Sequence, residues 1–124
     1  MTLPEWLNLL GRLGVAFYFL WAAWFNIGSR EHHYAEFRRI GLPYGAVFFW
    51  AGNAIALVGG LLLLYSPTAA YGAAMLVVFT LAADALFHRY WTYSDPGEAL
   101  MHKFFLFEHA ALIGGLFGLA APFV

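Results

Sequence analysis

The residues best suited to do chemistry are a small group of carboxylates and imidazoles in the second half of the chain: Asp84, His88, His102, Glu108 and His109. Asp84 and His88 are four residues apart, a spacing that places two side chains on one face of a helix. A histidine beside a carboxylate can titrate near neutral pH. This group is therefore a candidate site for proton exchange or ligand binding.

Depth along a helix predicts which of these side chains meet. If one helix leaves the membrane near Tyr90 and the next enters near His102, Asp84 and His109 both lie about 10 Å inside the same boundary, because a helix rises 1.5 Å per residue. We expect these two residues to form a pair. His88 and His102 are expected to form a shallower tier above it.

Two further polar residues belong to the candidate site. Asn53, in an earlier helix, is expected to reach the level of the predicted pair, whereas Glu108 is rotated by about 100° from His109. A carboxylate inside a membrane helix costs roughly 2.5 to 3.5 kcal/mol unless it is paired, protonated or hydrated. Asp84 and Glu108 are therefore expected to face the interior, with His109 as a partner.

Three interpretations of this cluster stay open at the level of sequence. The first is a hydrogen-bonded network that fixes the helix register, and the second is a proton-coupled or ligand-binding site. The third is a metal or haem site, because nitrogen and oxygen ligands suit zinc, copper or non-haem iron, and two histidines on different helices can hold a haem. No ligand-spacing motif requires a metal. For the haem, the pair would be His88 and His102.

Four long apolar stretches position these residues. Hydrophobic residues make up 63% of the chain and charged residues 10%, whereas a soluble domain has about 25% charged residues. Each stretch is near the roughly 20 residues that cross a bilayer, and continuous apolar runs in lipid favour helices. The predicted fold is an all-α integral membrane four-helix bundle in one domain, 1–124, with helices near 7–27, 44–65, 69–90 and 96–121.

Composition also excludes several classes of function. The chain has no cysteine, which excludes thiolate metal ligands and dithiol relay chemistry. Its six basic residues are too few for a nucleic-acid surface. The expected surroundings are instead the lipid bilayer. Since the amino terminus lacks the basic region of a signal peptide, we expect the first helix to be retained.

The distribution of positive charge predicts an orientation. Five of the six basic residues flank the connections after the first and third helices, and the remaining one is Arg12. By the positive-inside rule these two connections are cytoplasmic and both termini face the periplasm. The predicted location is the cytoplasmic membrane of a bacterium or archaeon. The five residues are Arg30, Arg38, Arg39, Arg89 and Lys103.

The two connections also carry helix signals. Ser29 is a candidate cap for a short interfacial helix that Gly41 and Pro43 would end. At the start of the last helix, Asp95 is a candidate N-cap and Glu98 can complete a capping box. Apolar and aromatic residues are expected to gather on one face of the interfacial helix: Tyr34, Phe37 and Ile40 share that face.

The order of these features resembles that of the DoxX-like membrane proteins, over nearly the whole chain. The matching features are Arg12, Gly41-Leu42-Pro43, the run 59–63, His88-x-x-Trp91, Asp95-Pro96 and the run 111–116. Glu108-His109 stands where many members have a Lys-Asn pair, and Asn26 where a lysine often ends the first helix. This change of charge favours a proton-accepting or metal-binding role for the site. It disfavours binding of the ligand that the lysines would hold in those members.

The resemblance implies a small membrane subunit of a respiratory or redox complex, with other membrane or redox subunits as partners. Such a subunit can contribute part of a quinone pocket, in which imidazoles meet the quinone oxygens. A non-catalytic anchor or assembly protein is the main alternative, and a transporter is disfavoured by size. The aromatic candidates for the pocket wall, otherwise an interfacial belt, are Tyr90, Trp91, Phe104 and Phe105.

Overall fold

The computed structural model describes residues 1–124 and is entirely helical, with four helices long and apolar enough to cross a membrane. The predicted all-α four-helix bundle is confirmed, and so is the short helix between the first two spans. The elements in chain order are α1 (Leu3–Gly28), α2 (Arg30–Arg39), α3 (Gly45–Leu64), η1 (Ser66–Thr68), α4 (Ala69–Phe87), η2 (Tyr90–Thr92), α5 (Pro96–Ala120) and η3 (Ala121–Phe123).

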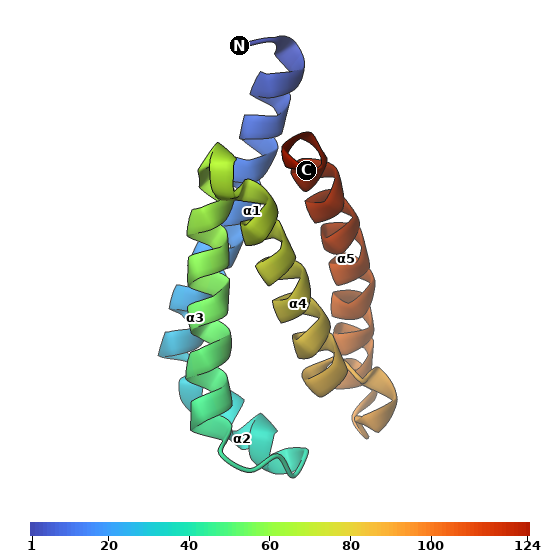
Figure 1. Ribbon diagram of the computed structural model, residues 1–124. Coiled ribbons are helices and arrows are strands. Elements are labelled where there is room, and N and C mark those ends of the chain that lie inside the picture. Colours follow the sequence, from blue (N-terminus) through green and yellow to red (C-terminus); the bar gives the residue numbers. More distant parts are fainter.

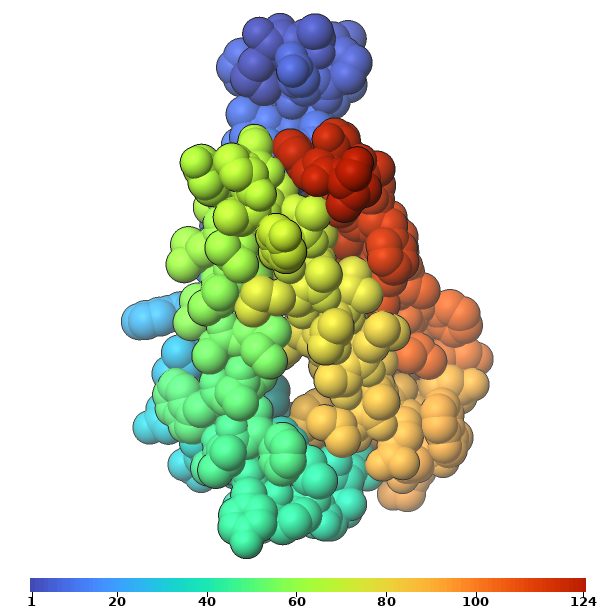
Figure 2. All heavy atoms as spheres, viewed as in Figure 1, coloured from blue at the N-terminus to red at the C-terminus, as the bar shows by residue number.

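The bundle has two unlike ends (Figure 1). Both chain termini and the turn between α3 and α4 lie at the narrow end, which we call the terminal end. The helix α2 lies across the other end, which we call the α2 end. From the terminal end, α3 and α4 diverge, and Figure 2 shows an opening between them just inside α2. The candidate residues therefore lie in the loosely packed half of the molecule.

Local capping explains two of the helix starts. Thr2 and Glu5 form a complete capping box, so α1 begins at Leu3, four residues before the predicted start. Asp95 caps α5 by accepting a hydrogen bond from the Glu98 N–H at 2.9 Å. Ser29 stands at the N-cap position of α2 as predicted, but its side chain does not cap the helix: its hydroxyl donates back to the α1 carbonyls of Phe25 and Asn26.

The helix α4 ends at Phe87, three residues before the predicted position. The carbonyl of Phe87 accepts a hydrogen bond of 2.7 Å from the Tyr93 hydroxyl. The last carbonyls of a helix have no N–H donor within the helix. When a side chain donates to such a carbonyl, no further turn of helix is needed to supply a donor. The chain therefore leaves the helical path at His88 and continues through η2.

Close helix packing occurs between α3 and α4 near the terminal end. A Cβ added to Gly72 would lie 2.5 Å from the Leu63 nitrogen and 2.6 Å from the Gly59 oxygen, so the two backbones touch there. Small residues at membrane helix interfaces permit this approach. By contrast, Gly114 and Gly118 of α5 face open space.

Arg12 ties the helices together at the terminal end. Its side chain is buried, with 4% of its surface exposed. The guanidinium carries its charge into the end of α3, where the last carbonyls of a helix have no partners within the helix. Its hydrogen bonds go to the carbonyls of Leu63 (3.0 Å) and Leu64 (3.1 Å), the Ser66 hydroxyl (3.2 Å) and the Asn8 side chain (2.9 Å).

Candidate functional site

Asp84 and His109 form the centre of the candidate site. Asp84 Oδ1 lies 2.5 Å from His109 Nδ1, and both side chains are largely shielded. The pair joins α4 to α5 across the loosely packed half of the bundle. The predicted contact between these two residues is confirmed. Since Asp84 holds Nδ1, the other ring nitrogen, Nε2, is the one left for a ligand.

His88 and His102 form the second tier, as expected. Their Nδ1 atoms are 2.9 Å apart, so one imidazole donates a hydrogen bond and the other accepts it. The His88 ring also lies 5.1 Å from the His109 ring, centroid to centroid. A haem iron between two histidines needs their nitrogens about 4 Å apart, given metal–nitrogen bonds of about 2.0 Å. The direct His88–His102 contact leaves no such space.

The aromatic wall of the site differs from the expected one. Phe105 lies against His88, with ring centroids 5.2 Å apart, and near His102 and His109. The other three expected residues lie elsewhere. Trp91 and Phe104 are exposed, and the Tyr90 ring packs against Trp91 and lies beneath the Lys103 ammonium.

Tyr93 completes the wall and was not predicted. Its ring stacks on His102, with centroids 4.0 Å apart and planes 13° from parallel. The Arg39 guanidinium lies 4.1 Å from the same centroid. Two groups this close to one ring, both face-on, must occupy opposite faces. No spacing rule singles out Tyr93, because its partners come from α2, α4 and α5.

Tyr93 also connects the site to α2. Its hydroxyl lies 3.1 Å from Glu36 Oε2, which in turn accepts a hydrogen bond from Arg39 Nε at 3.0 Å. Burial, followed by the negative charge of Glu36, raises the pKa of Tyr93 to about 12. The phenol therefore stays protonated at neutral pH and remains a hydrogen-bond donor. We call Glu36, Arg39 and Tyr93 the latch.

Two predicted members of the site lie apart from it. Asn53 is buried but donates to the Ala23 carbonyl at 3.1 Å, so it fixes α3 against α1 and does not reach the histidines. Glu108 is exposed and has no hydrogen-bond or ion-pair partner in the molecule. The expectation that Glu108 faces the interior with a partner is therefore wrong.

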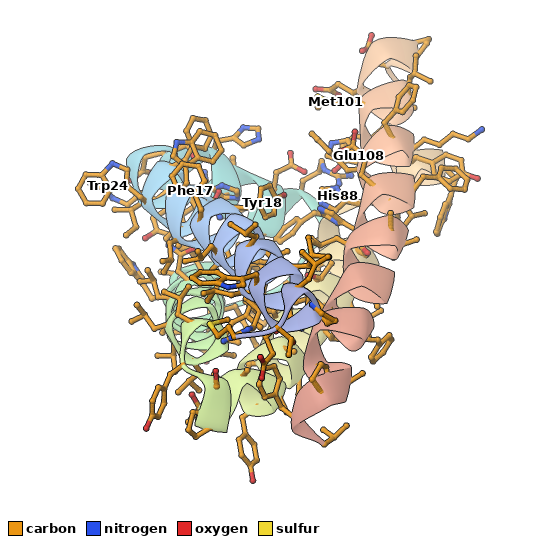
Figure 3. The ribbon with its side chains drawn as sticks, turned by 90° about the horizontal axis from the view of Figure 1, so that it is seen from above. Phe17, Tyr18, Trp24, His88, Met101 and Glu108 are labelled. Carbon is orange, nitrogen blue, oxygen red and sulfur yellow. The ribbon has the colours of Figure 1, made fainter.

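Glu108 instead borders a cavity of about 180 Å³ between α1 and α5. Figure 3 shows Tyr18 on the α1 side of this gap and Glu108 on the α5 side, with His88 close to Glu108 in this view. The lining residues are Tyr18, Glu108, His109 and Leu112. His109 thus contacts Asp84 on one side and a cavity on the other. A larger cavity of about 300 Å³, at the α2–α3 corner, contains none of the predicted site residues.

Comparisons with known proteins do not extend this description: no family model, curated protein or solved structure matches the chain.

Proposed function

We propose that the chain is a small integral membrane subunit of a redox complex, with a quinone-reactive and proton-exchanging site at its α2 end. The observation that carries the proposal is the position of His109, which joins the Asp84 carboxylate to a cavity between two membrane helices. A cavity of about 150 Å³ is large enough to bind benzene. The space beside His109 has a comparable volume, about 180 Å³, although it is an open recess on the side of the bundle and not an enclosed cavity.

The available hydrogen bonds fit a quinone head group. A quinone oxygen accepts hydrogen bonds, and His109 donates to one from Nε2 when its imidazole carries a proton on both nitrogens, with Nδ1–H donating to the Asp84 carboxylate. Tyr18 and Glu108 border the same space and offer further polar contacts. Reducing a quinone to a quinol takes two electrons and two protons. The partner subunits supply the electrons, and this chain supplies a route for the protons.

The proton route follows the contacts from the site to the α2 end. The His109 ring lies beside His88, and His88 shares a hydrogen bond with His102, which is the last imidazole of the route; Tyr93 covers the His102 ring by stacking and takes no part in proton transfer. Histidines carry protons readily near neutral pH. With the α2 end on the cytoplasmic side, the protons come from the cytoplasm, and the arginines of α2 lie at the height of the lipid head groups.

An anchoring or assembly role is the second candidate. The observation that favours it is the surface of α5, where Leu116 alone is buried and Gly114, Gly115 and Gly118 face open space. Small residues on a helix surface allow another membrane helix to approach closely. In that case α5 would dock against a larger partner, and the polar cluster would serve only to hold α4 and α5 together.

Two measurements on the chain in its native membranes test the proposal. Purification in mild detergent, followed by mass spectrometry, identifies the accompanying proteins; stoichiometric redox subunits are expected. Quinone reduction by that complex is then compared between wild type, His109→Ala and His32→Ala, the last an exposed imidazole outside the site. Loss of activity in His109→Ala alone, with the complex intact, supports the redox role.

The contrary results are equally specific. A complex that falls apart in His109→Ala favours the anchoring role. Unchanged quinone reduction in an intact His109→Ala complex would rule out the quinone site.

A further inference from the structure

We propose that Asp84, His88 and His109 bind one divalent transition-metal ion of the first row, such as Zn²⁺ or Fe²⁺. One ligand atom from each of the three residues lies within 4.8 Å of the others. This inference concerns the inner side of the cluster and goes beyond the proposed function, on which it does not depend.

The local structure explains why these three side chains converge. His88 is the C-cap residue of α4, one turn after Asp84, and its backbone N–H still donates to the Asp84 carbonyl at 3.2 Å, so both side chains leave α4 on the same side. The same spacing of four residues lets two side chains of one helix ligate a metal in other proteins. His109 approaches from α5, and so the three ligands come from two helices that already contact each other at Asp84 and His109.

The donor set determines the class of metal. Imidazole nitrogens suit zinc, copper, iron and nickel, whereas magnesium and calcium prefer oxygen ligands. Two histidines and one carboxylate are the ligands of many non-haem Fe²⁺ sites, and three protein ligands leave further positions open. With no cysteine in the chain, thiolate sites are excluded.

Metal binding requires one local adjustment. Ligands bound at about 2.0 to 2.1 Å in a tetrahedral site are roughly 3.3 Å apart, whereas Asp84 Oδ1 and His109 Nδ1 are 2.5 Å apart. The ion would replace the proton that these two atoms share and move them apart by less than 1 Å. His109 Nε2 would remain available to the cavity, so metal and ring can bind together.

The charge of the site also favours a cation. Asp84 and Glu108 lie in segments long and apolar enough to span the membrane, and neither has a lysine or arginine partner: the ion pairs of the molecule are His109–Asp84 and Arg39–Glu36. An uncompensated carboxylate in a membrane is costly. A divalent ion held by Asp84 and by His109, the residue next to Glu108 in the chain, would place two positive charges near both carboxylates.

The groups around the ligands hold them in place. A metal-binding histidine usually has a hydrogen bond at its other nitrogen, which fixes the ring orientation. His102 provides this bond to His88, since their Nδ1 atoms are 2.9 Å apart, which assigns the opposite nitrogen of His88 to the metal. Tyr93 and Phe105 pack against the rings of His102 and His88.

The test uses the purified chain in detergent, stripped with a chelator and without quinone or partner proteins. Co²⁺ and then Zn²⁺ are added, and binding is followed by the visible absorption of Co²⁺ and by metal analysis after gel filtration. Wild type is expected to bind one ion per chain. The Asp84→Asn variant keeps the size of the side chain, and it should lower the affinity about 10- to 100-fold, as should His109→Ala and His88→Ala.

The matched control is His32→Ala, which removes an exposed histidine and should bind as wild type does. Circular dichroism and gel filtration check that each variant is folded, and Asp84→Asn is the variant to compare if a histidine variant is not. Absence of stoichiometric Co²⁺ and Zn²⁺ binding by wild type would overturn the proposal. Equal affinity in folded wild type and Asp84→Asn would overturn it as well. Since no quinone is present, neither result bears on the quinone site.

Discussion

His109 contacts Asp84 through Nδ1 and Oδ1 at 2.5 Å, although 25 residues separate them in the chain. This contact joins α4 and α5 where the rest of the bundle opens, because α5 buries only Leu116, farther toward the terminal end. The polar pair therefore performs the packing role that apolar side chains perform elsewhere in the core. The same pair is the centre of both proposed activities.

The contact between α3 and α4 predicts a steric effect at Gly72. In Gly72→Ala the new Cβ would meet backbone atoms at 2.5 and 2.6 Å, so the helices must separate. Overpacking of this kind costs roughly 1 to 3 kcal/mol. Unfolding of the detergent-solubilised chain by sodium dodecyl sulfate measures the loss. Gly114→Ala is the control, because open space surrounds Gly114; equal stability of the two variants would contradict the prediction.

Arg12→Lys should destabilise the terminal end. The guanidinium donates to four oxygens at once, whereas a lysine ammonium has three donors and a different shape. Hydrogen bonds to charged groups contribute about 1.5 to 3 kcal/mol each. Losing one or two of them should lower the free energy of unfolding by about 2 to 4 kcal/mol in the same assay. Arg30→Lys, at an exposed position on α2, should change it little.

Acid should release the latch. Burial on its own raises the pKa of Glu36, but hydrogen bonds from Arg39 and Tyr93 outweigh it and lower the pKa below the ordinary value of 4.5. A lowered pKa means that the charged carboxylate stabilises the docked state. The stabilisation is therefore complete above pH 4.5 and is lost as the pH falls through the pKa in the docked state. The titratable and charged groups around Glu36 are Arg39 and His32 on α2, Tyr93, and His102 on α5.

Amide hydrogen exchange in residues 30–39, corrected for the intrinsic effect of pH, measures the release. Wild type should lose protection below pH 4.5. In Glu36→Gln, the amides of residues 30–39 should already be weakly protected at neutral pH, and acid should change their protection little. A wild-type helix that stays fully protected at pH 3 would show that Glu36 does not hold α2 in place.

The predicted orientation can be tested with single cysteines, because the natural chain has none. Ser94→Cys lies at the α2 end and Val124→Cys at the terminal end, both at exposed positions. A maleimide that does not cross membranes should label intact cells at position 124 and not at position 94. Both should react after the cells are opened. The reverse pattern would place the α2 end, and with it the proposed proton route, on the outside.

Sequence reasoning located the Asp84–His109 contact because depth depends only on residue counts from the helix ends. The rotation of a helix about its axis depends on packing, and α5 is apolar on nearly all sides. This is why Glu108 was placed inside although it is exposed. The latch was not predicted for a different reason: Tyr93 lies 57 residues after Glu36, and only the path of the chain after Phe87 brings it to Glu36 and Arg39 on α2.

The burial of Arg12 has a consequence for biosynthesis. Its partners Leu63, Leu64 and Ser66 follow it by 51 to 54 residues. While the ribosome is still making α3, the guanidinium of α1 has no carbonyl to bind and must remain in water or among lipid head groups. The bonds that fix α1 to the end of α3 can therefore form only after the turn between α3 and α4 has been made.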